Sequence, residues 1–569
     1  MSLPKDTDNI VNNRNAIDGL NQESICKDAQ AGVQKIEATT LVWSKTLLIV
    51  AYAMMWCIYF VNTMQQNTTS VLAPYVTSKF AEHSLTATTN AVSSLFGGLI
   101  RLPLAKVLDI WGRPQGYAFC VAVLTLGLIL MAGCENVETY AVAQVIYWVG
   151  YSGLAYTMSI FIADTSALKN RGLMLAFSSS PHIITGLIGG PLANSLILGP
   201  GYQWGFIIFA IVTPVITMPL FGIFMYAYYK AKKKGLYSET KSTRTTLGSI
   251  NHYFVEFDII GIVLILGGFA LLLLPFSLSQ KHPEGLQSPT IIAMILLGAV
   301  LLVAFVLWEK FLTPVRLLPY NLLVDRTILG GCILPAVAFV SFYTWNSYFS
   351  SFLQVVHSAD VIYANHINEI YSGGSCVSGL AVGLFLRSNG GMKWIALCVG
   401  VPLNILGVGL IILFRQPGCV LGYIIMCQIF IAVAGGTLHI CEQMAVMAVV
   451  EHQHISVVLA MQGAFSSIAG AVGATIATAI WQSVFPTRLM EYLPEKDKKD
   501  FTKIYGDLAV QLSYRNGTAT RDAIICAYGD AQKNLLITAT AILALSIPAV
   551  AVWRDVKLKE IKQTKGTVV

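Results

Sequence analysis

The chain has 569 residues, of which 55% are hydrophobic and 12% are charged, and its formal net charge is +7. Soluble domains carry roughly 25% charged residues, so this composition excludes a soluble globular protein of this length. The apolar residues lie in blocks of about twenty separated by short polar breaks, a pattern that predicts transmembrane helices.

Residues 1–45 are polar and carry both signs of charge, and they contain no apolar segment followed by a cleavage site. This pattern predicts a cytoplasmic tail and not a removable signal peptide. From Thr46 onward the sequence predicts about fourteen transmembrane segments. Their centres lie near residues 56, 97, 124, 150, 185, 215, 268, 298, 340, 377, 403, 430, 468 and 543. An even number of crossings places both ends of the chain on one side of the membrane.

The basic residues give the orientation of these segments. With both ends inside, about 25 of the 37 Lys and Arg residues fall in inside segments and about three in short outside loops. That asymmetry predicts cytoplasmic ends, because short inside loops are enriched in Lys and Arg. The net positive charge therefore records orientation and does not indicate nucleic-acid binding.

Motifs for catalysis, metal binding and nucleotide hydrolysis are absent from the sequence. The eleven cysteines are scattered, without a CxxC pair or a Cys/His cluster. The glycine-rich phosphate loop of ATPases is also missing. The sequence therefore predicts no cofactor, no bound metal and no enzyme, and any transport must draw its energy from a gradient or from the substrate.

A charged turn joins the second and third predicted helices. It runs from Arg101 through Lys106 and Asp109 to Gly112 and Arg113, and the glycine permits a tight reversal. The segment resembles the loop between helices 2 and 3 of the major facilitator superfamily, in which an Asp and basic residues latch the two halves of the protein together. The resemblance implies a conformational latch formed by Lys106, Asp109, Gly112 and Arg113. The alternative is an ordinary charged turn at the cytoplasmic surface.

The next predicted cytoplasmic loop runs from Asp164 to Gly172 and contains Arg171. It resembles the corresponding loop of the fungal siderophore-iron transporters, a fourteen-span branch of the same superfamily. Later strings resemble that branch too: Gln443-Met-Ala-Val-Met, Glu451-His-Gln-His454, Trp481, Tyr528-Gly-Asp and Trp553-Arg-Asp. The likeness covers nearly the whole chain after residue 45 and adds Asp164 and Arg171 to the latch.

The resemblance implies an all-α membrane protein of the major facilitator fold, with two pseudo-symmetric six-helix halves and two extra helices. The implied boundaries are a cytoplasmic tail at 1–45, an N-terminal half at 46–228, a basic linker at 229–257, the extra helices at 258–308, a C-terminal half at 309–553 and a cytoplasmic tail at 554–569. Such a fold holds its substrate between the halves, near the middle of the membrane.

A ferric siderophore surrounds its iron with its own oxygen ligands, so the protein need supply none. The resemblance implies a wide cavity with apolar and aromatic walls and scattered hydrogen-bonding groups. Polar stripes at helical spacing mark the candidates, although each stripe could also serve contacts between helices. The candidates are Tyr59, Asn62, Gln66, Gln144, Trp148, Tyr151, Ser178, His182, Tyr343, Asn346, Ser347 and Tyr371.

Ionisable residues inside predicted spans are candidates for proton coupling, because charge within a membrane is costly. They are Arg101, Glu369 and His182, whose imidazole titrates near neutral pH. Arg101 could instead snorkel or pair with a carboxylate, and His182 could be a neutral imidazole bonded to another helix. Glu442 and His439 are expected near the cytoplasmic interface, in a solvated role.

The one long outside loop is predicted at 483–533. By resemblance it forms a lid or a first contact for the substrate, and Tyr528 is the residue to test. Asn516 begins an Asn-Gly-Thr sequence, which is a glycosylation acceptor if the loop enters the secretory lumen.

The resemblance implies a monomeric secondary transporter that imports ferric siderophores, of the hydroxamate type, by symport with protons across a fungal plasma membrane. An exporter or vacuolar exchanger of another organic solute, such as a drug or glutathione, would use the same fold. The membrane could then be endosomal or vacuolar. A non-transporting sensor is disfavoured, because the polar tails are short.

Overall fold

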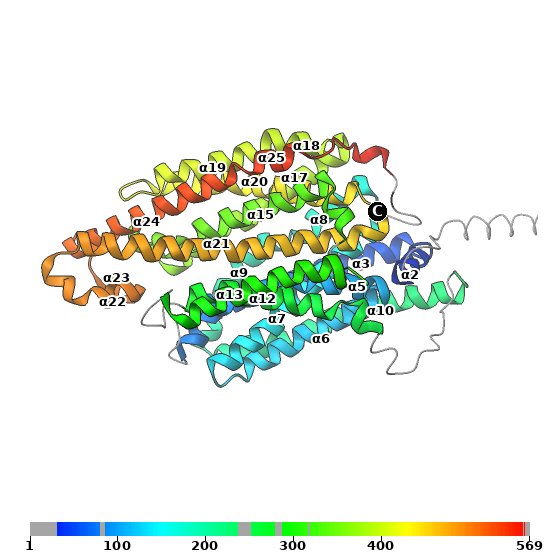
Figure 1. The fold of residues 1–569 in the computed structure, drawn as a ribbon, viewed down its shortest axis with the longest axis horizontal. Coiled ribbons are helices and arrows are strands. Elements are labelled where there is room, and N and C mark those ends of the chain that lie inside the picture. Colours follow the sequence, from blue (N-terminus) through cyan, green and yellow to red (C-terminus); the bar gives the residue numbers. More distant parts are fainter. Residues whose placement is uncertain are drawn as a thin grey trace, which may run out of the picture.

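In the part of the chain that it describes, the computed structural model is all-helical, with long helices running along the longest dimension of the molecule (Figure 1). The described residues are 31–79, 86–236, 252–278, 287–316, 319–561 and 563. Parts of the predicted tails and linker lie outside them: 1–30, 237–251 and 564–569.

The two ends of the molecule carry different segments. Helix α2 (Ala31–Thr40) and the short C-terminal turn Leu558–Glu560 lie at one end, which we call the latch end. The short helices α22 (Phe501–Gly506) and α23 (Leu508–Ser513) lie at the other, which we call the long-loop end.

The first group of long helices, here called the N-terminal bundle, has local sequence signals at several helix ends. Asn136 and Thr139 form a capping box at the start of α7. Gly112 precedes α6 with a φ of 117°, a conformation that favours glycine, and Pro114 occupies the first turn. The bundle consists of α3 (Lys45–Lys79), α4 (Thr86–Leu99), α5 (Arg101–Ile110), α6 (Arg113–Ala132), α7 (Val137–Thr165), α8 (Leu168–Ser179), α9 (His182–Leu198) and α10 (Tyr202–Lys233).

Two strongly apolar helices, α12 (Ile259–Leu278) and α13 (Pro289–Leu307), follow and pack against each other. A π-helical turn, Trp308–Leu312, continues α13. The indole Nε1 of Trp308 donates a 2.7 Å hydrogen bond to Oδ1 of Asp258. This bond joins the start of the pair to its end, and α12 packs in turn against α4 and α21.

The remaining long helices form the C-terminal bundle, and polar caps set their starts. Asp325, Asp360 and Thr518 accept hydrogen bonds from backbone N–H groups in the first turns of α15, α17 and α24. The bundle consists of α14 (Tyr320–Leu323), α15 (Arg326–Asn346), α16 (Phe349–Val356), α17 (Val361–Asn389), α18 (Met392–Ile395), α19 (Val401–Phe414), α20 (Leu421–Ala448), α21 (Ile455–Tyr492), α24 (Ala519–Leu543) and α25 (Ser546–Ala551).

Twelve helices in the described part of the chain are long and apolar enough to cross a membrane. They coincide with twelve of the predicted segments. The segments predicted near residues 97 and 268 are also helical but are not among the twelve. The first is divided at Ile100 into α4 and α5, where Pro103 in the first turn of α5 lacks a backbone donor. The second is represented by the shorter apolar stretch Ile259–Leu272.

The two bundles meet along α17 and α21. Helices α8 and α9 pack against α17, and α4 and α5 pack against α21. Glycine permits a close approach of two backbones, since a Cβ added to Gly383 of α17 would lie 2.7 Å from Leu173 Cα of α8. The bundles are therefore in direct backbone contact on the side of α8.

The long loop is shorter than the predicted 483–533. Helix α21 continues to Tyr492 and α24 begins at Ala519, so the connection between them is 493–518. The extra turns of α21 are stabilised by apolar burial, because Phe485 and Leu489 are fully buried against the C-terminal bundle. Thr487, Arg488 and Glu491, the polar residues of these turns, are exposed on the outer face of the helix.

Candidate functional site

A cavity of about 460 Å³ lies between the two bundles. Its volume is within the range of about 300–1,000 Å³ that is typical of small-molecule sites. Gln66 of α3, Ser179 of α8 and His182 of α9 form the N-terminal wall. Helices α15, α17, α19 and α20 form the rest.

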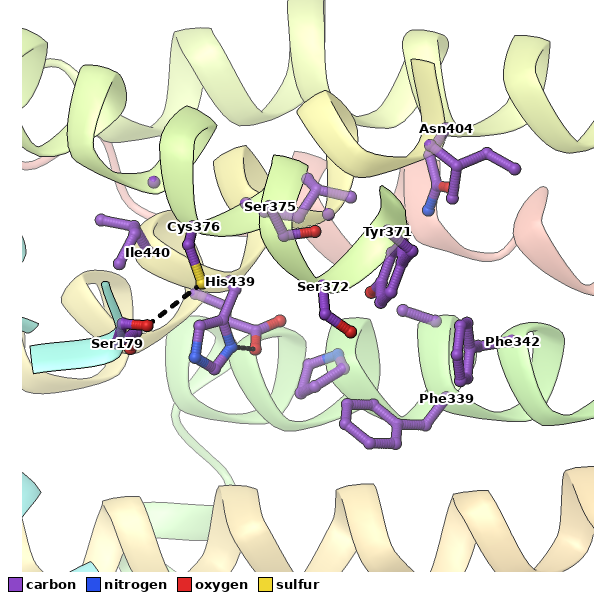
Figure 2. Close-up of a pocket in the computed structure, with 18 of the residues that line it drawn as sticks. Ser179, Phe339, Phe342, Tyr371, Ser372, Ser375, Cys376, Asn404, His439 and Ile440 are labelled. Atoms are coloured by element: carbon purple, nitrogen blue, oxygen red, sulfur yellow. Dashed lines mark hydrogen bonds and ion pairs between the residues drawn. The ribbon is translucent and has the colours of Figure 1, made fainter. Parts of the chain in front are cut away.

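Aromatic rings and neutral hydrogen-bonding groups dominate the C-terminal wall. The rings of Phe342 and Tyr371 are 4.8 Å apart between centroids and pack against each other, and Figure 2 shows Phe339 beside Phe342. Hydroxyl and amide groups are interspersed with these rings. No Lys or Arg is among the described residues that line the cavity, whose His and Glu members are His182, His439 and Glu442.

Three of the predicted cavity residues line this space: Gln66, His182 and Tyr371. A fourth stands directly behind, because the hydroxyl of Tyr151 donates a 3.2 Å hydrogen bond to Oε1 of Gln66. Those that do not line it are Tyr59, Asn62, Gln144, Trp148, Tyr151, Ser178, Tyr343, Asn346 and Ser347.

Most of these other candidates serve contacts between or within helices. The hydroxyl of Tyr59 donates to the carbonyl of Ala155 on α7 at 3.3 Å, and Ser178 bonds within its own helix. Asn62 and Gln144 are buried within the N-terminal bundle. Residues of one polar stripe thus face different neighbouring helices, because the stripe covers a broad arc of the helix surface.

Arg101, a predicted proton-coupling residue, is the first residue of α5, and its side chain extends to α21 of the C-terminal bundle. A Cβ added to Gly463 of α21 would overlap its guanidinium. Its nearest titratable neighbours are the hydroxyls of Tyr59, Tyr151 and Tyr156. No carboxylate among the described residues pairs with it, so the predicted alternative of carboxylate pairing is not observed.

Glu442 and His439, expected near the cytoplasmic interface in a solvated role, lie in the cavity wall, and Glu442 is buried there. Glu442 is six residues, or about 9 Å, from the end of α20, and that depth is enough to reach the space between the bundles. Nδ1 of His439 is 3.3 Å from Oε1 of Glu442.

Glu369, another predicted proton-coupling residue, does not line the cavity. It lies on α17 and faces α9, where a Cβ on Gly186 would be 3.0 Å from Oε2. Glu369 therefore belongs to the packing surface between the bundles.

A buried ion-pair cluster closes the latch end. Nη1 of Arg113 lies 3.0 Å from Oδ1 of Asp109, and Nε of Arg113 lies 3.0 Å from Oδ2 of Asp164. Each of the three side chains is at most 3% exposed. One guanidinium thus joins two predicted latch residues, Asp109 near the end of α5 and Asp164 near the end of α7.

Both carboxylates of this cluster also bind the C-terminal bundle. The hydroxyl of Ser456 donates to Oδ2 of Asp109, and Nε2 of His452 lies 3.2 Å from Oδ1 of Asp164. The hydroxyl of Tyr156 donates to the carbonyl of Ser456 at 2.5 Å. The bundles are therefore held together at the latch end by polar contacts to the start of α21.

Arg171 is fully buried and anchors a third connection. Its Nη2 donates to the carbonyls of Ala163 and Ser166, and its Nη1 donates to Oε1 of Gln563 at 2.9 Å. The remaining charged residue of the predicted latch, Lys106, lies apart from both of these connections. Lys106 donates to the carbonyl of Val315 at 3.2 Å, in the segment before α14, and is not part of the ion-pair cluster.

The chain is similar to a known protein family over most of its length. The model of the Major Facilitator Superfamily matches residues 55–474. "MFS siderochrome iron transporter 1" of Ajellomyces capsulatus is 58% identical over 96% of this chain and 93% of its own length. The chain belongs to the fungal siderophore iron transporters of the major facilitator superfamily. It is a multi-pass membrane protein of a transporter family, not an enzyme.

Other members of the family match over similar lengths. "Siderophore iron transporter mirB" of Emericella nidulans is 41% identical over 95% of this chain and 89% of its own length. "Siderophore iron transporter 1" of Schizosaccharomyces pombe is 34% identical over 94% and 87%. Among solved structures, the human organic anion transporter MFSD10 (TETRAN) covers 87% of this chain and 98% of its own, with a TM-score of 0.54 and 10% identity. That likeness shows the fold alone.

Three partners of the predicted latch residues were not found from the sequence: Ser456, His452 and Gln563. The string Glu451-His-Gln-His454 was noticed for its resemblance, but nothing in it indicates contact with residues some 290 to 350 positions earlier. Gln563 lies in the predicted tail, where a lone glutamine carries no signal.

Among the described residues there is no group of three His, Cys, Asp or Glu side chains that could hold a metal ion.

The predicted residues of the long-loop end are also placed by the structure. Tyr528 lies on α24 and is 2% exposed. Its hydroxyl donates to Oε1 of Gln511 at 2.8 Å, and its ring packs against Trp481 and Phe485. Tyr528 therefore holds the loop 493–518 to the C-terminal bundle from a buried position. Asn516 is exposed on the loop, where Nδ2 donates to the hydroxyl of Ser358.

Proposed function

We propose that the protein imports ferric siderophores of the hydroxamate type by symport with protons across a fungal plasma membrane. The names of its relatives indicate the substrate class. The observation in this chain that carries the proposal is the cavity between the bundles, with its aromatic and hydrogen-bonding walls.

The charge of the cavity favours hydroxamates over catecholates. Three singly charged hydroxamates neutralise Fe³⁺, whereas three doubly charged catecholates leave a triply negative complex. An anionic complex would require Lys or Arg in a low-dielectric site. The described lining residues include neither, and they include the carboxylate of Glu442. A neutral complex held by rings, hydroxyls and amides suits this lining best.

The closed latch end supports alternating access as the mechanism. We assign this end to the cytoplasm, with fourteen crossings and both ends of the chain inside, as the distribution of basic residues predicts. The Asp109–Arg113–Asp164 cluster and its bonds to Ser456 and His452 then hold the cytoplasmic side shut. Breaking those contacts as the bundles rock would release the substrate inside. At the outer side, the loop 493–518 with Tyr528 would act as a lid.

The test is uptake of ⁵⁵Fe-labelled ferric trihydroxamate by a fungus that lacks its own siderophore transporters and expresses this chain. Import predicts accumulation at acidic external pH that a protonophore abolishes. A ferric catecholate of similar size is the matched substrate and should accumulate poorly. Loss of preloaded label from the cells, or labelling confined to vacuoles, would identify an exporter or a vacuolar exchanger instead.

A further inference from the structure

One turn of α20 brings a carboxylate and an imidazole together in the cavity wall. Nδ1 of His439 is 3.3 Å from Oε1 of Glu442, the contact drawn as a dashed line beside His439 in Figure 2. Nε2 of the same ring is 3.2 Å from Nε2 of Gln443. With the NH₂ group of Gln443 facing the ring, the neutral tautomer that this arrangement favours accepts at Nε2 and carries its proton on Nδ1, facing the carboxylate.

The two partners differ sharply in exposure. The side chain of Glu442 is 6% exposed, whereas that of His439 is 54% exposed. Water that enters the cavity can therefore reach the ring, whereas the carboxylate beside it is almost fully covered. The ring thus offers a path for protons between the cavity and Glu442.

Glu442 has no fixed positive partner among the described residues. The titratable groups near it are Tyr371 of α17, Cys332 of α15, and Cys441 and His439 of its own helix. On the N-terminal wall, across the cavity, the titratable group is His182 of α9. None of these carries a permanent charge, and a buried carboxylate without a cation is costly inside a membrane. Binding a proton removes that cost.

The helix that carries the pair also touches the other bundle. Ile440 and Met444 of α20 lie 3.3 and 3.5 Å from the position that a Cβ on Gly172 of α8 would occupy. Separation of the bundles at the latch end would break this contact. The surroundings of Glu442 therefore change with the access state, as a coupling group requires.

We infer that Glu442 is the proton-carrying group of the transport cycle and that His439 relays protons between it and the cavity. The inference rests on the proposed symport and names the site that performs it. Loading transfers the Nδ1 proton of His439 to Oε1 of Glu442 while Nε2 takes a proton from a hydronium ion in the cavity, which leaves the imidazole neutral and releases water. Release to the cytoplasm reverses both transfers.

The other predicted candidates lack this arrangement. Glu369 lies in the interface between α17 and α9, outside the cavity lining. His182 lines the cavity, but no carboxylate among the described residues pairs with it. Among the described residues, the α20 pair alone combines a buried carboxylate with an imidazole open to the cavity.

The experiment compares two modes of transport by purified protein in liposomes. Accumulation driven by an inward proton gradient requires the proton to bind and leave. Counterflow of labelled against unlabelled ferric trihydroxamate at equal pH requires only the movement of loaded carrier. Glu442→Gln should reduce accumulation by about tenfold or more, while its counterflow persists and no longer responds to pH. His439→Gln should slow accumulation and shift its pH profile.

Two further variants complete the design. Glu138→Gln changes an exposed carboxylate in the first turn of α7 and should behave as the parent protein does. Glu369→Gln tests the rival carboxylate. Full accumulation by Glu442→Gln would overturn the inference, as would equal loss of accumulation and counterflow, or loss of coupling in Glu369→Gln alone. If the parent protein itself fails to accumulate label, the proposed symport is wrong, and the inference falls with it.

Discussion

Gln563 and Arg171 are hydrogen-bonded at 2.9 Å across 392 positions of sequence. Nε2 of Gln563 also donates to the carbonyls of Met447 and Val450, at 2.7 and 2.6 Å. A single side chain of the C-terminal tail thus connects α8 of the N-terminal bundle to the end of α20. The tail is therefore part of the closed latch end.

Replacing Gln563 by Ala should loosen the latch end. The change removes three hydrogen bonds worth about 1 kcal/mol each, so amide hydrogen exchange of residues 447–456 should be faster by about tenfold or more. Gln416→Ala is the matched variant, because the amide of Gln416 bonds to the carbonyl of Ile412 at the end of α19. It should leave exchange at 447–456 unchanged. Equal exchange in Gln563→Ala and the parent protein would show that the tail does not hold the latch.

Asp109→Asn should reduce uptake by about tenfold while the amount of protein at the cell surface stays the same. The amide can still accept from Ser456, but it leaves Arg113 with one carboxylate where it had two. Ser456→Ala keeps the ion pairs and removes only the bond between the bundles, so its defect should be smaller. Unchanged uptake by Asp109→Asn in a transport assay with surface labelling would refute the latch assignment.

Gly383→Ala should block close packing of α17 on α8. Its Cβ would lie 2.7 Å from Leu173 Cα, a backbone atom that cannot move without shifting the helix. Uptake should fall by about tenfold or more, since overpacking costs about 1–3 kcal/mol. Gly373→Ala, on the same helix, meets nothing within 4 Å and should transport normally. Similar uptake by the two variants would mean that the bundles need not approach so closely.

Arg415→Lys should destabilise the long-loop end. Arg415 follows α19, and its buried guanidinium lies 4.0 Å from the centre of the Phe349 ring of α16, while Nη1 donates to Trp345 O of α15 and Gln532 Oε1 of α24. Burial lowers the pKa of Arg415 from 12.5 to about 9, so the group is still charged at neutral pH. A lysine cannot stack on the ring or reach both acceptors, and about 2 kcal/mol should be lost.

The measurement for Arg415→Lys is the thermal unfolding of purified protein in detergent, with Arg488→Lys as control. Arg488 is exposed near the same end of the molecule and pairs with the exposed Glu491. Surface pairs contribute little, so the control should unfold at the parent temperature. A fall in Tm for Arg488→Lys as large as that for Arg415→Lys would assign the effect to lysine in general.

The helices and the latch loops were predictable because their signals are local. Apolar blocks mark the spans, and Gly112 marks the turn that brings Arg113 back to Asp109. The cavity was less predictable, because the rotation of each helix decides which side chains reach it. Gln66 lines the cavity, whereas Asn62, one turn away on the same predicted stripe, is buried inside the bundle.

Contacts between distant segments had no signal in the single sequence. Ser456 and His452 bind carboxylates of the opposite bundle only because the bundles pack in one register. Glu442 was misplaced for a related reason, since distance along a helix does not show how far a cavity extends toward the helix end. The segment at 483–533 was read as loop from its polar residues, although burial of Phe485 keeps it helical as far as Tyr492.

The central claim is proton-coupled import, and the most direct measurement is the flux of protons with substrate in the same liposomes. Protein is reconstituted without an imposed pH gradient, ferric trihydroxamate is added outside, and a trapped pH dye and ⁵⁵Fe are followed together. Symport predicts that the interior acidifies as label enters, and that an imposed inward proton gradient drives label above its outside concentration. Entry of label without acidification, or alkalinisation of the interior as label enters, would contradict the account.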